Sequence, residues 1–448
     1  MSTIRAKERD AIIQSLRAGV VPRIGQHLIQ VGRLNEVEAM LKDIERCSDD
    51  GSAIRFVIGE YGSGKTFFLN LIRSIALEKH MVTVHGDLSP DRRLHASDGQ
   101  ARSLYSEMMH NIATRSKPEG MAMNSVVERF VSGALEEARA SGVSPDSVIQ
   151  SRLHSLSEMT CGYDFSQVVA AYWHGHDKGD EQVKGDAIRW LRAEFATRTD
   201  ARAALGVRTI IDDDTFYDNL KLMGRFVRLS GFQGMFVMLD EMVNLYKVAN
   251  TQARNANYEE ILRILNDCLQ GSAAGLGFVM GGTPDFLLDT RRGLYSYQAL
   301  QRRLAENTFA VGGLVDYSSP VLRLANLSPE EFYLLLGKIR HVFAYGDPSR
   351  YLITDEGLSQ FMEHCSKRIG EAYFRTPGTT ITAFTNLLSV LEQNPQASWK
   401  ELLGGVTIAK DVDPHLDSGA NGGAEPKLTE AASEKPASPS DELSSFRL

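Results

Sequence analysis

GEYGSGKT, residues 59–66, is the stretch of sequence that decides the fold. It fits the pattern GxxxxGK[ST] of a phosphate-binding loop at every fixed position. In such loops, backbone N–H groups surround the phosphates, and the positive end of the following helix attracts them. The lysine binds β- and γ-phosphate oxygens, and the last hydroxyl is a magnesium ligand. We therefore expect ATP and Mg²⁺ as cofactors, bound by Gly59, Glu60, Tyr61, Gly62, Ser63, Gly64, Lys65 and Thr66.

The segments around this loop predict an α/β fold with a parallel sheet. A short apolar run over 53–58 is typical of a buried strand, 67–78 has the apolar spacing of a helix, and 81–85 is a second apolar run. Strand, helix and strand in this order indicate a mostly parallel sheet flanked by helices. Short, continuous apolar runs at 235–239 and 276–280 predict two further central strands.

Most of the remaining chain has a helical pattern. Residues from about 104 to 205 predict a large helical insertion, because a connection between parallel strands needs only about a dozen residues. After Ser319, helical patterns at 330–343, 355–367 and 381–391 predict a small α-helical lid. The last segment is poor in large apolar residues, which predicts a disordered tail. The expected parts are N-terminal helices with an adenine-flanking loop over 1–50, the core over 51–318, the lid over 319–408 and the tail over 409–448.

Composition restricts the class of protein. The 448 residues carry a net charge of −8 and have a pI of about 5.8, which excludes a bulk electrostatic coat for DNA but allows a local basic patch. The N-terminus has no apolar signal region, and no apolar run reaches the roughly 18 residues of a membrane span. We therefore expect a cytoplasmic protein with no membrane partner. Reduced, buried thiols are expected, without disulfide or metal spacing, at Cys47, Cys161, Cys268 and Cys365.

Two acidic residues follow the strand predicted at 235–239. A buried strand that ends in Asp240 brings a carboxylate to the magnesium ion beside the phosphate-binding loop. The next residue, Glu241, is then placed to polarise a water molecule toward the γ-phosphate. A similar acidic group, Asp212–Asp214, follows an apolar run of only two residues, Ile210 and Ile211. This second group predicts a loop or a helix cap instead of a strand end.

Together these motifs resemble the origin-recognition-complex-like branch of the AAA+ ATPases. The stretch 31–36 (VGRLNE) is similar to the vGRxxE element that precedes the phosphate-binding loop in this branch. More narrowly, the chain resembles the BrxD family of ATP-binding proteins from bacterial BREX-type anti-phage systems. This narrower resemblance covers roughly residues 5–400 and rests on GEYGSGKT, HGDLSPDRRLH (85–95), the helical insertion, GMFVMLDEMVNLYK and GGTPDF (281–286).

The resemblance implies roles for four further residues. Arg33 and Ile24, in the 21–25 loop, correspond to the elements that flank the adenine. Thr283 follows the strand predicted at 276–280 and corresponds to a small polar residue that helps to orient the attacking water; the alternative is a simple cap of the next helix. Arg375 corresponds to the lid arginine that reaches the γ-phosphate, but Gly378 stands where a basic residue is expected, so this lid element departs from the family pattern.

Arginine residues near 300 are candidates for catalysis between subunits. A guanidinium donated across a subunit boundary stabilises charge on a transferring phosphoryl group. Arg303 and Arg302 are the main candidates for this role, with Arg291 and Arg292 as weaker ones. The alternative explanation is a basic helix face that is simply solvated.

The resemblance implies an ATP-hydrolysing protein of BREX-like defence. It implies assembly on DNA as a ring or open ring of identical subunits, and the loading or regulation of a partner helicase. An ATP-dependent assembly switch, or a STAND-like infection sensor with slow hydrolysis, is the alternative. Glu241 favours an ATPase with turnover, because a protein that only binds ATP needs no base to polarise water.

Overall fold

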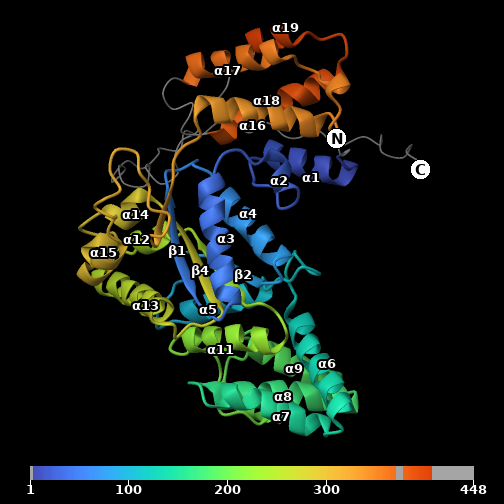
Figure 1. Cartoon of the computed structure of the whole chain (residues 1–448), viewed down its shortest axis with the longest axis vertical. Coiled ribbons are helices and arrows are strands. Elements are labelled where there is room, and N and C mark those ends of the chain that lie inside the picture. The colour runs from blue at the N-terminus through green and yellow to red at the C-terminus, as the bar shows by residue number, and fades with distance from the viewer. Residues whose placement is uncertain (1–3, 370–376, 406–448) are drawn as a thin grey trace, which may run out of the picture. The chain divides into compact units, whose positions relative to one another are not determined.

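A sheet of five parallel strands forms the centre of the fold (Figure 1). The computed structural model describes residues 4–369 and 377–405. The tail predicted over 409–448 and the lid candidate Arg375 lie outside these residues. The order of strands across the sheet is β2-β3-β4-β1-β5, with every pairing parallel. The strands are β1 (Ala53–Gly59), β2 (Val82–Asp87), β3 (Met235–Asp240), β4 (Leu276–Gly282) and β5 (Val321–Leu324).

Four of the five strands confirm the prediction from apolar runs. Each of them ends one or two residues later than its apolar run, because Gly59, Asp87, Asp240 and Gly282 continue the strands at the carboxyl edge. The fifth strand, β5, is a correction, since only helices were expected after Ser319. It is four residues long and contains an exposed arginine, so its sequence has no clear strand pattern. Its pairing with β1, and not its composition, defines it as a strand.

Helices cover both faces of the sheet, as the alternation of side chains along β1 requires. Val57 points into a cluster formed with α3 (Leu34–Ser48) and α4 (Lys65–Glu78). Its neighbours Phe56 and Ile58 belong to the cluster on the opposite face. That face is covered by α5 (Gln100–His110), α11 (Phe216–Leu229) and α13 (Thr251–Gln270). The α/β core of P-loop type, with a parallel sheet between helices, is therefore confirmed.

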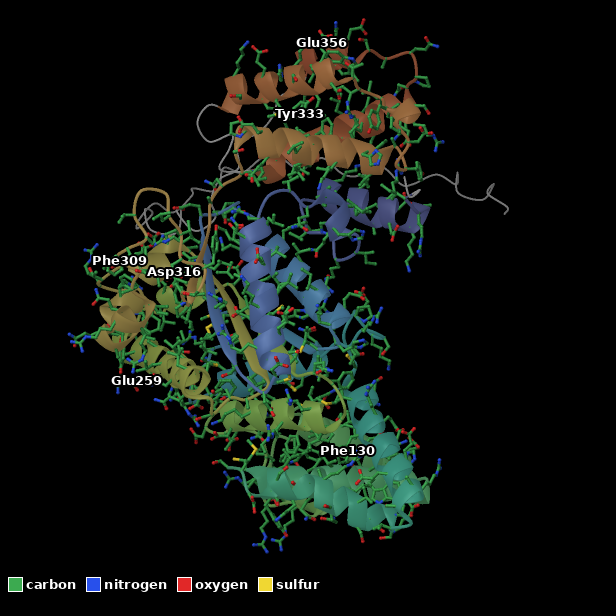
Figure 2. All side chains as sticks on the ribbon, viewed as in Figure 1. Phe130, Glu259, Phe309, Asp316, Tyr333 and Glu356 are labelled. Atoms are coloured by element: carbon green, nitrogen blue, oxygen red, sulfur yellow. The ribbon has the colours of Figure 1, made fainter. Side chains whose placement is uncertain are left out.

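The chain between β2 and β3 is helical, as predicted for the insertion. Phe130 of α6 packs on Phe226 of α11 with ring centroids 5.1 Å apart, which joins the insertion to the sheet-covering helix (Figures 1 and 2). The acidic group at 212–214 forms no strand: Asp213 accepts the N–H groups of Gly99 and Arg102 and so caps the start of α5. The helices after α5 are α6 (Met123–Ser141), α7 (Pro145–Ser157), α8 (Gly162–Lys178), α9 (Glu181–Leu191) and α10 (Arg198–Leu205).

The first and last described helices share one hydrophobic cluster. Ile12 and Ile13 of α1 pack with Leu336 and Ile339 of α16 and with Phe384 of α18. The three lid helices predicted from the sequence correspond to α16, α17 and α18; α2 and α19 are additional short helices. The bounds are α1 (Ala6–Arg17), α2 (Gln26–Ile29), α16 (Pro329–Phe343), α17 (Asp355–Ile369), α18 (Pro377–Gln393) and α19 (Trp399–Gly405).

The segment between β3 and β5 contains several short helices besides α13. Within 4–369 and 377–405, every helix is too short or too polar to cross a membrane. The four cysteines form no disulfide among these residues, as expected; Cys161 is only partly buried, contrary to prediction, because it lies at a helix start. The short helices between β3 and β5 are α12 (Val243–Tyr246), α14 (Pro284–Leu288) and α15 (Gln298–Leu304), with a 3-10 turn at Leu294–Ser296. A second 3-10 turn, Pro348–Arg350, lies between α16 and α17.

A buried ion pair links one helix layer to the sheet beside the phosphate-binding loop. Arg55, in the middle of β1, donates to both carboxylate oxygens of Asp43 on α3, at 2.5 and 3.1 Å. The two side chains are only 5% and 1% exposed. Arg55 also donates to the carbonyls of Tyr317 and Ser319, just before β5. The pair therefore fixes α3, β1 and β5 relative to one another.

Replacing Asp43 with Asn should destabilise the fold strongly. The amide would leave the guanidinium of Arg55 buried without a compensating charge, which typically costs about 3–5 kcal/mol. Chemical denaturation should report this loss in the free energy of unfolding. Asp49→Asn is the matched control, because Asp49 directly follows the same helix and its side chain is exposed, and such a surface change alters stability by less than about 0.5 kcal/mol. Equal stability of the two variants would contradict the role given to the pair.

Candidate functional site

The phosphate-binding loop connects β1 to α4 at the carboxyl edge of the sheet. Gly64 is the N-cap of α4 and has a left-handed backbone with φ of 84°, a conformation in which a side chain would be strained. The Lys65 ammonium donates to the carbonyls of Gly59 and Glu60, both at 2.9 Å. The lysine charge is thus held against the loop that the sequence predicted, at the start of a 14-residue helix.

Thr66 and Asp240, the two predicted magnesium ligands, lie in direct contact. The Thr66 hydroxyl donates to Asp240 Oδ2 at 2.8 Å, although the residues are far apart in the sequence. Space for the carboxylate is made by Gly281 of β4, where an added Cβ would collide with Asp240 Oδ1. One hydroxyl and one carboxylate beside a phosphate-binding loop fit Mg²⁺, which takes few protein ligands and completes its shell with water and phosphate.

Glu241 follows Asp240 in an unusual backbone conformation. Its φ is 58°, which is uncommon for a residue with a side chain. The Glu241 N–H donates to Asp240 Oδ1 at 2.9 Å, so the strained turn is held by the carboxylate itself. The Met242 N–H then donates to the Gly281 carbonyl at 3.0 Å, which ties the turn to β4. Glu241 is therefore exposed at the sheet edge, directly after the magnesium candidate.

Asp87 is a third carboxylate at this edge, and the sequence analysis gave it no role. It ends β2 and pairs in register with Asp240, because β2 and β3 are neighbours in the sheet. Partial burial raises the pKa of Asp87 above its ordinary value, and the negative charge of Asp240 raises this pKa further; Arg92 and Arg23 act in the opposite direction. The sequence signal for Asp87 was its place just after the apolar run predicted as the second strand, at 81–85. This signal points to the site only once β2 is known to lie beside β3 in the sheet.

Arg23, in the 21–25 loop, brings a positive charge near His85 and Asp87 at the end of β2. Burial lowers the pKa of His85 to about 4, and the charges of Arg73 and Arg23 contribute to this shift. Burial and the charge of Arg23 also lower the pKa of Arg73. His85 is consequently neutral at physiological pH. Ile24, the predicted adenine neighbour in this loop, is 38% exposed and so remains accessible to a ligand.

Arg33 contacts the phosphate-binding loop from the start of α3. Its guanidinium donates to the carbonyl of Ser63 at 3.2 Å and to the carbonyl of Ala325, just beyond β5. It also pairs with Glu36 at 3.6 Å. The structure thus brings Arg33 to the phosphate-binding loop, and its predicted place beside the adenine stays a prediction.

Thr283 lies at the end of β4, the strand between Asp240 and the phosphate-binding loop in the sheet. Its hydroxyl accepts the Phe286 N–H at 3.4 Å, so it caps α14, with Pro284 as the first helical residue. Capping was the alternative to the catalytic role. The position of Thr283 between the two parts of the site is compatible with both roles.

The arginine candidates lie on α15 and in the segment between α14 and α15. Arg302 and Arg303 are exposed on α15, which is anchored by the buried side chains of Leu300 and Leu304. Among the described residues, neither guanidinium pairs with a carboxylate; Arg303 donates to the Ala299 carbonyl of its own helix. The two weaker candidates differ in their surroundings. Arg292 lies over the ring of Tyr246, whereas the side chain of Arg291 is 90% exposed.

The lid candidate Arg375 lies outside the described residues, and Gly378 is the second residue of α18.

The site as a whole joins a lysine, a hydroxyl and a carboxylate at the end of a parallel sheet. This arrangement has the donors that phosphate oxygens require and an oxygen pair that fits a divalent cation. The family model of the BREX system ATP-binding proteins BrxC/D matches residues 4–407, nearly the whole described chain. No curated protein matches the chain. The chain therefore belongs to the BREX system ATP-binding protein BrxC/D family and is an ATP-binding component of a BREX defence system.

Proposed function

We propose that this protein is a Mg²⁺-dependent AAA+ ATPase that assembles on DNA in the cytoplasm and loads or regulates a partner helicase. The observation that carries the ATPase assignment is the hydrogen bond of 2.8 Å between Thr66 and Asp240. It joins the phosphate-binding loop to the acidic strand end, and both are needed for phosphoryl transfer to water. The helicase partner is taken from the resemblance to the origin-recognition-complex-like ATPases.

Each residue of the site has one task in this proposal. Lys65 leaves its carbonyl contacts to bind the β- and γ-phosphates, and Thr66 and Asp240 hold the cation. When bound, Mg²⁺ neutralises charge that develops on the phosphate oxygens. Glu241 polarises the attacking water, and Thr283 orients it from the neighbouring strand. Arg33 and Ile24 bind on the nucleoside side of the loop.

The surface around α15 supports assembly from identical subunits. Arg302 and Arg303 are exposed there without acidic partners among the described residues. The segment that follows α15 carries four apolar side chains that are 63–84% exposed: Phe309, Val311, Leu314 and Val315 (Phe309 in Figure 2). Clustered exposed apolar residues are typical of protein–protein contact surfaces. A second copy of the chain would cover them and receive the neighbouring arginines.

Replacing Lys65 with Ala should reduce the affinity for ATP by about 10²-fold or more, because charge-assisted hydrogen bonds to two phosphates are lost. Isothermal titration with ATP and Mg²⁺ measures the effect. Lys79→Ala is the matched control: this lysine is exposed and follows the last residue of the same helix. Wild-type affinity in the Lys65 variant would show that the nucleotide site lies elsewhere.

A further inference from the structure

A hollow lined by basic and hydroxyl side chains together with Phe232 lies at the amino edge of the sheet, opposite the nucleotide site. Its volume is about 670 Å³. His80, which lines it, comes just before β2, and Phe232 comes just before β3. Because the strands are parallel, their starts lie at the edge opposite to Lys65 and Asp240, which stand at strand ends. The hollow is therefore separate from the site assigned to ATP.

One wall of the hollow is a stripe on helix α6. Ser125, Arg129 and Ser132 line it at spacings of four and three residues, which places them on one face of the helix. The guanidinium of Arg129 is held in a fixed orientation: it donates to the carbonyls of Ser230 and Gly231 at 3.0 and 3.1 Å and lies 4.7 Å from the ring centre of Phe232. These bonds use Nε and Nη2, so Nη1 remains available as a donor.

A second part of the lining is the turn at 114–117, which contributes Thr114, Arg115 and Ser116. The Thr114 and Ser116 hydroxyls are hydrogen bonded to each other at 3.1 Å, and the backbones of Thr114 and Lys117 exchange two hydrogen bonds. Arg115 lines the hollow and pairs with Glu78 at 3.1 Å. Both of these side chains are more than half exposed, and such surface pairs contribute little energy, so an anion can replace the glutamate.

The chemistry of the lining selects an anion. Among the described residues that line the hollow there are two arginines, a histidine, four hydroxyl groups and no carboxylate. Arginine and hydroxyl side chains are the donors that proteins use most for phosphate oxygens of DNA. On α6, the donors at Ser125 and Ser132 are spread over about 10 Å of helix and do not converge on one point. That length corresponds to about three nucleotides at 3.4 Å per nucleotide along one strand.

We propose that this hollow binds the phosphodiester backbone of DNA. It supplies a local basic contact on a chain whose net charge of −8 would otherwise repel nucleic acid. The inference rests on the DNA-dependent assembly proposed above, and the hollow is the surface that would contact the DNA. Because the proposed contacts are to the phosphates, binding should be independent of sequence.

The test is DNA binding by full-length variants, measured by fluorescence anisotropy with ATP present. Arg115→Ala should weaken binding about tenfold and lower the slope of log affinity against log salt by about 1, as for the loss of one phosphate contact. Ser132→Glu places a negative charge on the same surface and should weaken binding at least as much. Arg139→Ala and Ala140→Glu are matched controls, because both residues are exposed on the same helix and outside the hollow.

The outcomes separate this inference from the proposed function. Loss of DNA binding in Arg115→Ala and Ser132→Glu, with unchanged melting temperature, unchanged DNA-free ATPase rate and normal binding by the controls, supports the inference. If the wild type binds DNA and both variants bind it equally well, the inference is overturned while DNA-dependent assembly stands. If the wild type binds no DNA, both are overturned. If the variants lose only the binding of inorganic phosphate, the hollow takes a free phosphate group and the DNA assignment is wrong.

Discussion

Replacing Arg303 with Ala is expected to lower the ATPase rate about 10³-fold or more while leaving ATP affinity unchanged. The reason is that a guanidinium supplied by a neighbouring subunit stabilises charge only on the transferring phosphoryl group. The arginine is exposed on α15 and pairs with no carboxylate among the described residues, so its guanidinium is available to a neighbouring subunit. Specific activity of the wild type should accordingly rise with protein concentration. Arg302→Ala should show the same loss if Arg302 is the residue that reaches the neighbour.

Mixing variants tests whether this catalysis occurs between subunits. Arg303→Ala has an intact nucleotide site, whereas Lys65→Ala has an intact arginine, so mixed assemblies should recover part of the activity. Arg139→Ala controls for the loss of one exposed arginine charge. A specific activity that does not change with concentration, and no recovery on mixing, would assign both arginines to a solvated helix face.

Replacing Glu241 with Gln is expected to slow hydrolysis by about 10²–10⁴-fold, the usual contribution of a positioned general base. The amide keeps the size of the side chain but cannot accept a proton from water. ATP binding should remain, since Lys65 and the Thr66–Asp240 pair are untouched. Any ATP-dependent assembly should therefore persist longer in this variant. Phosphate release measured at saturating ATP, together with mass measurement, reports both effects.

The control for Glu241 is Glu259→Gln. Glu259 is an exposed glutamate of α13 (Figure 2), so its substitution makes the same change of charge outside the site. If Glu241→Gln hydrolyses ATP at the wild-type rate, and Asp240→Asn binds ATP and Mg²⁺ normally, the acidic strand end is not part of the site. An assembly that is ATP-dependent but unaffected by the Glu241 substitution would favour the switch over the enzyme.

The sequence predicted the fold well where the information is local. Central strands of a parallel sheet are buried on both faces, so they are continuous apolar runs, and the phosphate-binding loop between one of them and α4 has a fixed pattern. Asp240 was found for the same reason, as the polar end of such a run. The strand β5 was missed because its four residues include the exposed Arg323. Its identity depends on the pairing of Phe56 with Val321, which no local pattern contains.

The remaining features depend on contacts between distant segments. Arg55 lies inside a predicted apolar strand, and only the position of Asp43 on α3 explains how its charge is buried. Asp87 lies beside Asp240 only because β2 and β3 are neighbours despite the long insertion between them. The hollow at the amino edge likewise combines α6, the 114–117 turn and the residues before β3. Periodicity and motif spacing describe single segments, so they cannot indicate such combinations.

The strand order has a consequence for the nascent chain on the ribosome. β1 and β2 are synthesised first, but in the sheet β4 and β3 separate them. Translation of the stretch from Asp87 to Asp240, the end of the first strand that can pair with either of them, covers about 153 residues and takes about 8–30 s at 5–20 residues per second. During this interval, two apolar strands have no native partner, and unpaired strand edges of this kind promote aggregation. The helical insertion can fold from local contacts in the meantime, so the strands made before it are the part of the nascent chain most exposed to aggregation.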